Sequence, residues 1–241
     1  MAKSIEGSPY TRFEGEIALI AHIRSGIVTF SRPTTESNDT LEVELDREAN
    51  VNPSFREAWN ASGNCRNLPD IVQKYETTLK RSEIKLIMAY TYEGEPGNPK
   101  FYKELNEDFR NNDLMGGRFP NAKRILRNAL IELMEFQKEN GKKLPVVLYR
   151  WEPSFLAQQY QEQKDKSMHL NMFTSTSVEM SGDMRSKEND MLTKFIEPET
   201  GAFIEDFSFY DETEVLLPPL HGKIKVNEAS KTGSKLQGPI L

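Results

Sequence analysis

Cysteine and histidine are scarce in this chain of 241 residues. Cys65 is the only cysteine, so no disulfide can form within the chain, and a chain of this length buries roughly 70 to 75% of its unfolded surface without cross-links. The three histidines, His22, His169 and His221, are too far apart in sequence to suggest a cluster of metal ligands. We therefore expect a fold that matures in a reducing compartment and holds no metal.

Long apolar runs and an excess of basic residues are also missing. No run approaches the ~20 apolar residues that span a bilayer, and residues 1–8 lack the apolar core of a signal peptide. The net charge is −6, because 37 acidic residues outnumber 31 basic ones, and this balance disfavours a surface that tracks nucleic-acid phosphates. We expect a cytosolic, soluble monomer with no membrane span and no nucleic-acid partner.

The usual signatures of phosphate-binding loops and of acyl transfer do not occur in the sequence. No GxGxxG follows a predicted strand and no Gly-rich GK[ST] loop is found, while Gly116-Gly117-Arg118 fits a turn before a helix. There is no GxSxG turn and no cysteine close to a histidine. These absences exclude the common classes of nucleotide-binding loop and of nucleophilic hydrolase.

The first half of the chain carries apolar residues at helical spacing from Asn67 onwards. A stripe begins at Leu68, and a longer one predicts a helix over 121–139 that Gly141 ends. Residues 31–64 are polar with scattered turn residues, and they give no clear element. The sequence therefore predicts a helical first half.

After Pro145 the pattern changes to short apolar or β-branched runs. They predict strands over 146–150, 170–177, 202–209, 214–217 and 223–226. Segments 152–164 and 186–194 fit short helices or structured loops. Helices followed by strands give an α+β order, in contrast to βαβ alternation.

The same composition suggests three parts. Residues 67–227 form one domain, 1–66 form an N-terminal extension that packs on it, and 228–241 form a flexible tail with little to bury.

Polar residues stand at the ends of three predicted strands. Arg150 closes one, hydroxyls fill 174–177, and Glu212 and Glu214 precede Val215 in a third. Side chains two apart in extended chain share a side, so both glutamates can face one cleft. Each motif alone is also typical of a solvated sheet edge, in a chain with 37 acidic residues. Their order and spacing carry more weight, since Ser175 follows Arg150 by 25 residues and Glu214 follows Ser175 by 39.

This order of motifs resembles the R-S-E class of arginine-directed mono-ADP-ribosyltransferases. The matching segments are Leu148-Tyr149-Arg150, 173–177 and 212–219, with weaker similarity at 89–91 and at 102–110. The resemblance covers about 70–226. It implies an α+β fold in which a helical N-terminal half precedes a strand-rich half of two packed antiparallel or mixed sheets around an NAD cleft.

The resemblance implies that NAD is the substrate and that the bond between nicotinamide and ribose breaks. Glu214 would stabilise the ribose cation, Ser175 would orient Glu214, and Arg150 would hold the diphosphate. Glu212 would align an acceptor arginine and take its proton. A glutamine at this place goes with other acceptors in the family, so Glu212 favours arginine.

Four further residues are candidates for NAD contacts. Thr176 and Ser177 would support the strand or the ribose. Arg185 would make a second phosphate contact or carry a solvated loop charge. Trp151 stands where the family usually has glycine, and its ring would either wall the nicotinamide pocket or pack in the core.

Phe209 and Tyr210, in the turn before Glu212, are candidates for target recognition, with ordinary packing as the alternative. The implied partners are NAD and a protein with an exposed arginine. Lack of a signal peptide and of paired cysteines departs from the secreted vertebrate enzymes and favours a bacterial effector delivered into another cell. Two alternatives stay open, an NAD glycohydrolase of the same fold and an inactive binding module.

Overall fold

The structure is a computed structural model. Its described residues are 17–25, 37–153, 156, 160, 162, 167–180, 191–220 and 222–230. Side chains are not described in the strands at 17–25 and 222–230 or at positions 167 and 168. Arg185 lies outside these residues, as do the ends of the chain.

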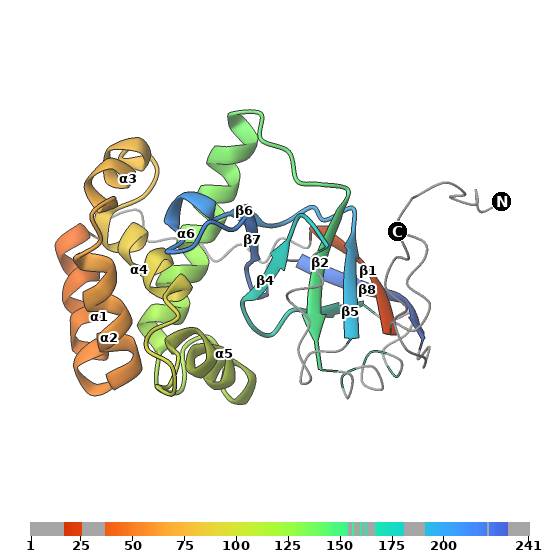
Figure 1. The fold of residues 1–241 in the computed structure, drawn as a ribbon, viewed down its shortest axis with the longest axis horizontal. Coiled ribbons are helices and arrows are strands. Elements are labelled where there is room, and N and C mark those ends of the chain that lie inside the picture. Colours follow the sequence, from red (N-terminus) through yellow and green to blue (C-terminus); the bar gives the residue numbers. More distant parts are fainter. Residues whose placement is uncertain are drawn as a thin grey trace, which may run out of the picture.

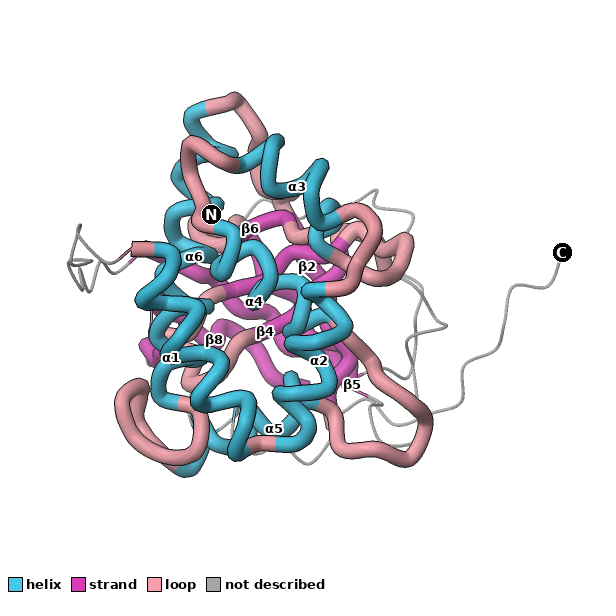
Figure 2. The backbone as a smooth tube through the Cα atoms, turned by 90° about the vertical axis from the view of Figure 1, so that its left-hand side faces the viewer, coloured by secondary structure: helices cyan, strands magenta, loops and turns pink. Residues whose placement is uncertain are grey.

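Helices and strands occupy separate sides of the molecule, with the helices at the left of Figure 1 and most strands at the right. The helices are α1 Asn38–Val51, α2 Pro53–Gly63, α3 Leu68–Tyr75, α4 Arg81–Thr91, α5 Phe101–Asn111 and α6 Pro120–Glu139. Figure 2, seen from the helical side, shows α1, α2 and α4 in front of the strands. Within the described ranges, no helix has the length and apolarity needed to cross a membrane.

Helix α4 lies at the centre of the helical half. Between Ile84 and Tyr90 every residue except Lys85 is at most 4% exposed. A helix that is apolar on most sides is stable only when other elements surround it, and α1, α2, α3, α5 and α6 all contact this one. The helix predicted over 121–139 is confirmed as α6, which starts with Pro120 in its first turn.

The polar segment 31–64 contains two helices that its composition did not indicate. In α1 and α2, Leu41, Leu45, Phe55 and Trp59 recur four residues apart and are at most 2% exposed. They belong to the same hydrophobic core as α4 and α6. The helical signal was diluted because charged residues fill the exposed face between these few apolar positions.

The described strands join in one hydrogen-bonded order, β3-β8-β1-β5-β2-β4-β7-β6. Their bounds are β1 Ile17–Ser25, β2 Val147–Glu152, β3 Ser167–His169, β4 Thr174–Ser177, β5 Met191–Ile196, β6 Ala202–Phe203, β7 Glu214–Leu217 and β8 Gly222–Ser230. β1 and β5 are parallel and the other neighbours are antiparallel. Where two sheets were expected, these strands form a single eight-stranded sheet, in which β3-β8-β1-β5-β2 and β4-β7-β6 meet at one residue pair, Tyr149 and Ser177.

Two local predictions were wrong. Residues 191–194, expected in a helix or loop, begin strand β5, whose first three residues are all buried. This strand lies between β1 and β2 and has no exposed face, so it lacks the alternation that identifies a strand. The strand expected over 202–209 is only Ala202–Phe203, because Glu205–Phe207 turn into a 3₁₀ segment, η2.

Asp108 fixes the end of α5, the helix that faces β4. Its carboxylate accepts hydrogen bonds from the backbone N–H groups of Arg118 at 3.0 Å and Phe119 at 3.2 Å, and it pairs at 3.1 Å with Lys123, which is 0% exposed. Gly117 has a φ of 75°, and a Cβ there would lie 2.2 Å from Asp108 Oδ1. The loop after α5 is therefore wrapped around one buried carboxylate.

We expect Asp108→Asn to lower the free energy of unfolding by about 3–5 kcal/mol, because it leaves the buried ammonium of Lys123 without its counter-charge. Burial raises the pKa of Asp108, but the backbone hydrogen bonds and Lys123 outweigh it and the pKa lies below its usual 3.8. The charged form is thus the stabilising one. The difference between wild type and variant, measured by urea unfolding, should shrink as the pH falls below 3.8.

Glu205→Gln is the matched control, since it also neutralises a carboxylate in an ion pair. Glu205 and Lys142 are 38% and 37% exposed, and such a pair contributes at most ~1 kcal/mol. Equal losses in the two variants would contradict the role given to Asp108.

Candidate active site

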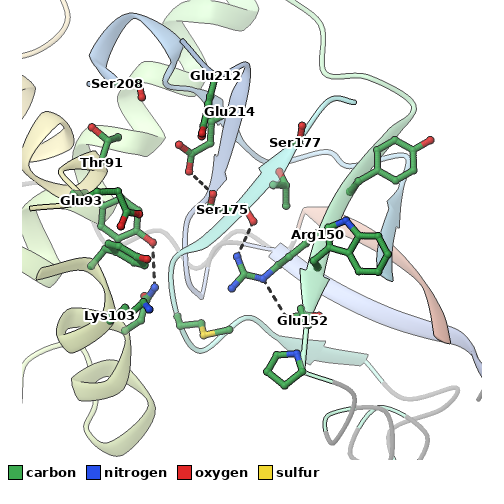
Figure 3. Close-up of a pocket in the computed structure, with 18 of the residues that line it drawn as sticks. Thr91, Glu93, Lys103, Arg150, Glu152, Ser175, Ser177, Ser208, Glu212 and Glu214 are labelled. Carbon is green, nitrogen blue, oxygen red and sulfur yellow. Dashed lines mark hydrogen bonds and ion pairs between the residues drawn. The ribbon is translucent and has the colours of Figure 1, made fainter. Parts of the chain in front are cut away.

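A cleft of about 1670 Å³ opens between the helical half and the sheet. Its walls come from α4, α5, β2, β4 and the turn before β7, and Figure 3 shows ten of the lining residues labelled. Small-molecule pockets are usually ~300–1,000 Å³, so this cleft has room for more than a compact ligand. Arg150, Ser175, Glu212 and Glu214 all line it.

Strands β4 and β7 hold Ser175 beside Glu214. The pair is antiparallel with Ser177 opposite Glu214, so Ser175 lies diagonally across from the glutamate on the same face. The Ser175 hydroxyl donates a hydrogen bond to Glu214 Oε1, drawn as a dashed line in Figure 3. The strand register therefore fixes the direction of this carboxylate.

The pKa of Glu214 is raised above its usual 4.5. Burial is the largest cause, the nearby charge of Glu212 adds to it, and the Ser175 hydrogen bond and the charge of Arg150 act in the opposite direction. A carboxylate in such surroundings gains from any positive charge that forms beside it, because little water is present to solvate it.

Arg150 reaches from β2 to β4. Its Nη1 donates to the backbone oxygen of Ser175 at 2.7 Å, and its Nε donates to Glu152 Oε1 at 3.2 Å. The side chain remains 24% exposed, and in Figure 3 it lies between Ser175 and Glu152. The structure thus brings the arginine, the serine and the glutamate of the three motifs into one cleft.

Glu212 lies in the exposed turn before β7 and also lines the cleft. Its backbone N–H donates to the oxygen of Tyr210 at 3.0 Å, and its own oxygen accepts from the N–H of Glu214 at 3.1 Å. Tyr210 is 44% exposed and lines the cleft mouth. Phe209 is placed differently, since its ring packs on Tyr92 with centroids 5.3 Å apart and it is not part of the cleft wall.

The other expected contact residues differ in their surroundings. The Thr176 side chain is 3% exposed and its hydroxyl donates to Val215 O at 2.7 Å, so this hydroxyl is used within the sheet. Ser177 lines the cleft half-buried, and its hydroxyl accepts from Glu179 N at 3.2 Å. Trp151 also lines the cleft half-buried.

Several side chains of the cleft were given no role from the sequence. Asn106 clasps the backbone of Phe173, accepting from its N–H at 3.0 Å and donating to its oxygen at 3.1 Å, and it also donates to the Tyr90 hydroxyl. This clasp holds the chain at the start of β4. Glu152 and Tyr102 also line the cleft. Sequence similarity marked the segments that hold Tyr90, Tyr102 and Asn106, but only the docking of α4 and α5 on β4 shows what they face.

Known proteins share the sequence pattern and the fold of this chain. A family model described as NAD:arginine ADP-ribosyltransferase matches residues 30–237. A mutant of the eukaryotic mono-ADP-ribosyltransferase ART2.2, solved in complex with NAD, is 15% identical with a TM-score of 0.55, covering 91% of this chain and 97% of that one. The type III effector XopAI from Xanthomonas axonopodis pv. citri is 16% identical with a TM-score of 0.57, covering 82% of each chain. No curated protein sequence gives a match.

At these identities the two solved structures bear on the fold alone. The α+β fold with a helical first half, expected from the sequence, is confirmed.

The surroundings of Glu214 predict opposite effects of two substitutions on its pKa. Ser175→Ala removes a hydrogen bond that favours the carboxylate, so the pKa should rise further. Glu212→Gln removes a nearby negative charge, so the pKa should fall. Carbon NMR titration of labelled glutamate carboxyls would measure both. Shifts of the same sign in the two variants would contradict the arrangement.

Proposed function

The chain belongs to the NAD:arginine ADP-ribosyltransferase family, and on that premise we propose that it transfers ADP-ribose from NAD to an arginine side chain of a target protein. The observation that carries the proposal is the meeting of Arg150, Ser175 and Glu214 in one cleft. Each of the three offers a group that the reaction needs.

Glu214 would act on the bond that breaks. When the bond between nicotinamide and ribose C1′ cleaves, its electron pair leaves with neutral nicotinamide, and the positive charge passes to the ribose as an oxocarbenium ion. A half-buried carboxylate next to C1′, as Glu214 would be, stabilises that charge more than it stabilises the ground state. The hydrogen bond from Ser175 would keep Glu214 pointed at the sugar.

Arg150 would bind the diphosphate of NAD. A guanidinium is planar, permanently charged and able to donate two parallel hydrogen bonds to phosphate oxygens. Its side chain is partly exposed on the cleft wall next to Ser175, so a dinucleotide held there would lie across β4 with its ribose close to Glu214. Trp151 and Ser177 line the same cleft, and we assign the nicotinamide ring and the ribose to their side of it.

Glu212 would act on the acceptor. A guanidinium attacks C1′ through a nitrogen lone pair and must lose a proton as the new C–N bond forms, and the exposed carboxylate of Glu212 is placed to align it and accept that proton. Glu93, Glu179 and Asp211 also line the cleft, so its mouth is acidic. Such a mouth favours a positively charged acceptor.

Tyr210 would contact the target protein. It is 44% exposed at the cleft mouth, in the same turn as Glu212. An exposed aromatic beside the acceptor residue is a suitable anchor for a protein surface. We place the reaction inside a target cell, with the protein acting as a bacterial effector, because a fold with a single cysteine needs no oxidising compartment.

Labelled NAD tests the proposal. Incubation with cell lysates should label proteins through a bond sensitive to hydroxylamine, and mass spectrometry should locate ADP-ribose on arginine. Glu214→Ala should lower the rate by roughly 10²–10³-fold, because it removes the charge that stabilises the ribose cation. Lysates from varied sources that all stay unlabelled by the wild type would count against transfer to protein.

Glu212→Gln separates the two halves of the reaction. Transfer to arginine should fall at least about 10²-fold, while NAD hydrolysis persists because Glu214 is intact and water replaces the acceptor. Release of nicotinamide and labelling of protein would be measured in parallel, with Glu205→Gln as the control that changes neither. Equal loss of both activities in Glu212→Gln would show that this residue does not act on the acceptor alone.

A further inference from the structure

Glu152 is a buried carboxylate that the proposed reaction leaves without a role. It is 2% exposed, at the end of β2 and two residues after Arg150. Burying a carboxylate is costly unless other groups pair with it and satisfy its oxygens. The contacts around Glu152 therefore indicate what the residue is for.

Three side chains donate to this carboxylate. Arg150 Nε donates to Oε1 at 3.2 Å, the Thr193 hydroxyl donates to Oε2 at 2.5 Å, and the Tyr160 hydroxyl donates to Oε2 at 3.2 Å. Burial, followed by the charge of Glu152, raises the pKa of Tyr160, so its hydroxyl keeps its proton and remains a donor. Both oxygens of Glu152 are thus fixed in direction.

The strand register explains how these groups meet. Arg150 and Glu152 lie on the same face of β2, because they are two residues apart in an extended strand. Thr193 is the partner of Arg150 on β5 and is 0% exposed. Its side chain therefore lies beside both residues, and three of the four groups in the network belong to the paired strands β2 and β5.

The fixed carboxylate of Glu152 restricts the orientation of the Arg150 guanidinium. Glu152 holds its Nε, and the oxygen of Ser175 holds one of its Nη1 hydrogens. A guanidinium has five N–H donors, so these two contacts, among the residues that the structure describes, leave three for an anion. Held at two points, the planar group presents these donors to the cleft in one orientation.

We propose that Glu152 is a positioning residue, which sets the orientation of the Arg150 guanidinium for the diphosphate of NAD. The inference rests on the proposed function, in which Arg150 binds that diphosphate. Thr193 and Tyr160 act through Glu152 in turn, since both donate to its Oε2 and so fix the direction of the carboxylate that holds Arg150 through Oε1.

Glu152 also neutralises part of the charge of Arg150, and the two effects predict opposite results. Loss of orientation weakens the binding of a diphosphate, whereas loss of the competing negative charge strengthens it. Glu152→Gln keeps the size of the side chain and removes the charge that fixes Arg150. The sign of its effect on NAD binding therefore decides between the two.

In Glu152→Gln we expect the KM for NAD in hydrolysis to rise about ten-fold with kcat within about two-fold of wild type, because the clamp is misplaced while Glu214 is intact. The dissociation constant of ADP-ribose, which carries the diphosphate, should rise by the same factor, and that of nicotinamide should not change. An unchanged or lowered KM would overturn the inference.

Glu48→Gln is the matched control. Glu48 is also a buried glutamate, 6% exposed, and it accepts from the N–H groups of Asn121 and Ala122 at 2.9 Å at the start of α6, away from the cleft wall. It should lower the thermal unfolding temperature without raising the KM for NAD. A rise in KM equal to that of Glu152→Gln would make the effect a general loss of stability and would refute the proposal.

If Glu152→Gln does not fold, Thr193→Val tests the proposal instead. It removes one donor to Glu152 while the ion pair with Arg150 remains, so the KM for NAD should rise in the same direction by a smaller factor. A wild-type protein that does not bind NAD would overturn this inference together with the proposed function. Wild-type binding with no change in either variant would overturn this inference alone.

Discussion

The guanidinium of Arg150 links β2 to β4, the two neighbouring strands of the sheet that share the fewest residue pairs. The two halves of the strand order share a single residue pair there, Tyr149 and Ser177, so the ladder itself gives β4 little support on that side. The hydrogen bond from Arg150 to the oxygen of Ser175 adds a second link, and Asn106 holds Phe173 from the helical side. The position of β4 sets the position of Ser175, and Ser175 in turn orients the carboxylate of Glu214. The geometry of the cleft therefore depends on how β4 is held against β2.

Positively and negatively charged side chains line different parts of the cleft. Arg150 lies against the buried Glu152, so the one described cation of β2 is already partly balanced before any ligand enters. Burial is the main reason that the pKa of Glu214 is raised, and the negative charges of Glu212 and Glu93 raise it further. An anionic diphosphate and a cationic acceptor would thus be drawn to different parts of one cavity. The layout suits a reaction that joins two substrates of opposite charge.

The sequence predicted those parts of the fold that depend on local pattern. The long helix α6, strand β7 and the order of the three motifs are visible because their periodicity or spacing is local or linear. Strand β5 was missed because it is buried on both faces and shows no alternation.

The helices α1 and α2 were missed because few apolar positions mark them. The contacts of Glu152 with Thr193, of Thr176 with Val215 and of Phe209 with Tyr92 could not be predicted, since each joins residues that are far apart in the sequence. Such contacts follow from docking, and no sequence window contains them.

The boundary between Glu212 and Glu214 has a consequence for how such enzymes diverge. Glu214 is inside the β-ladder and Glu212 is outside it, only two positions earlier. A replacement at position 212 disturbs no strand pairing and no packed interior, so the protein tolerates it at little thermodynamic cost. With the roles proposed for these two residues, acceptor preference would be free to change in a lineage while the strand that carries Glu214, and with it the cleavage of the bond between nicotinamide and ribose, is retained.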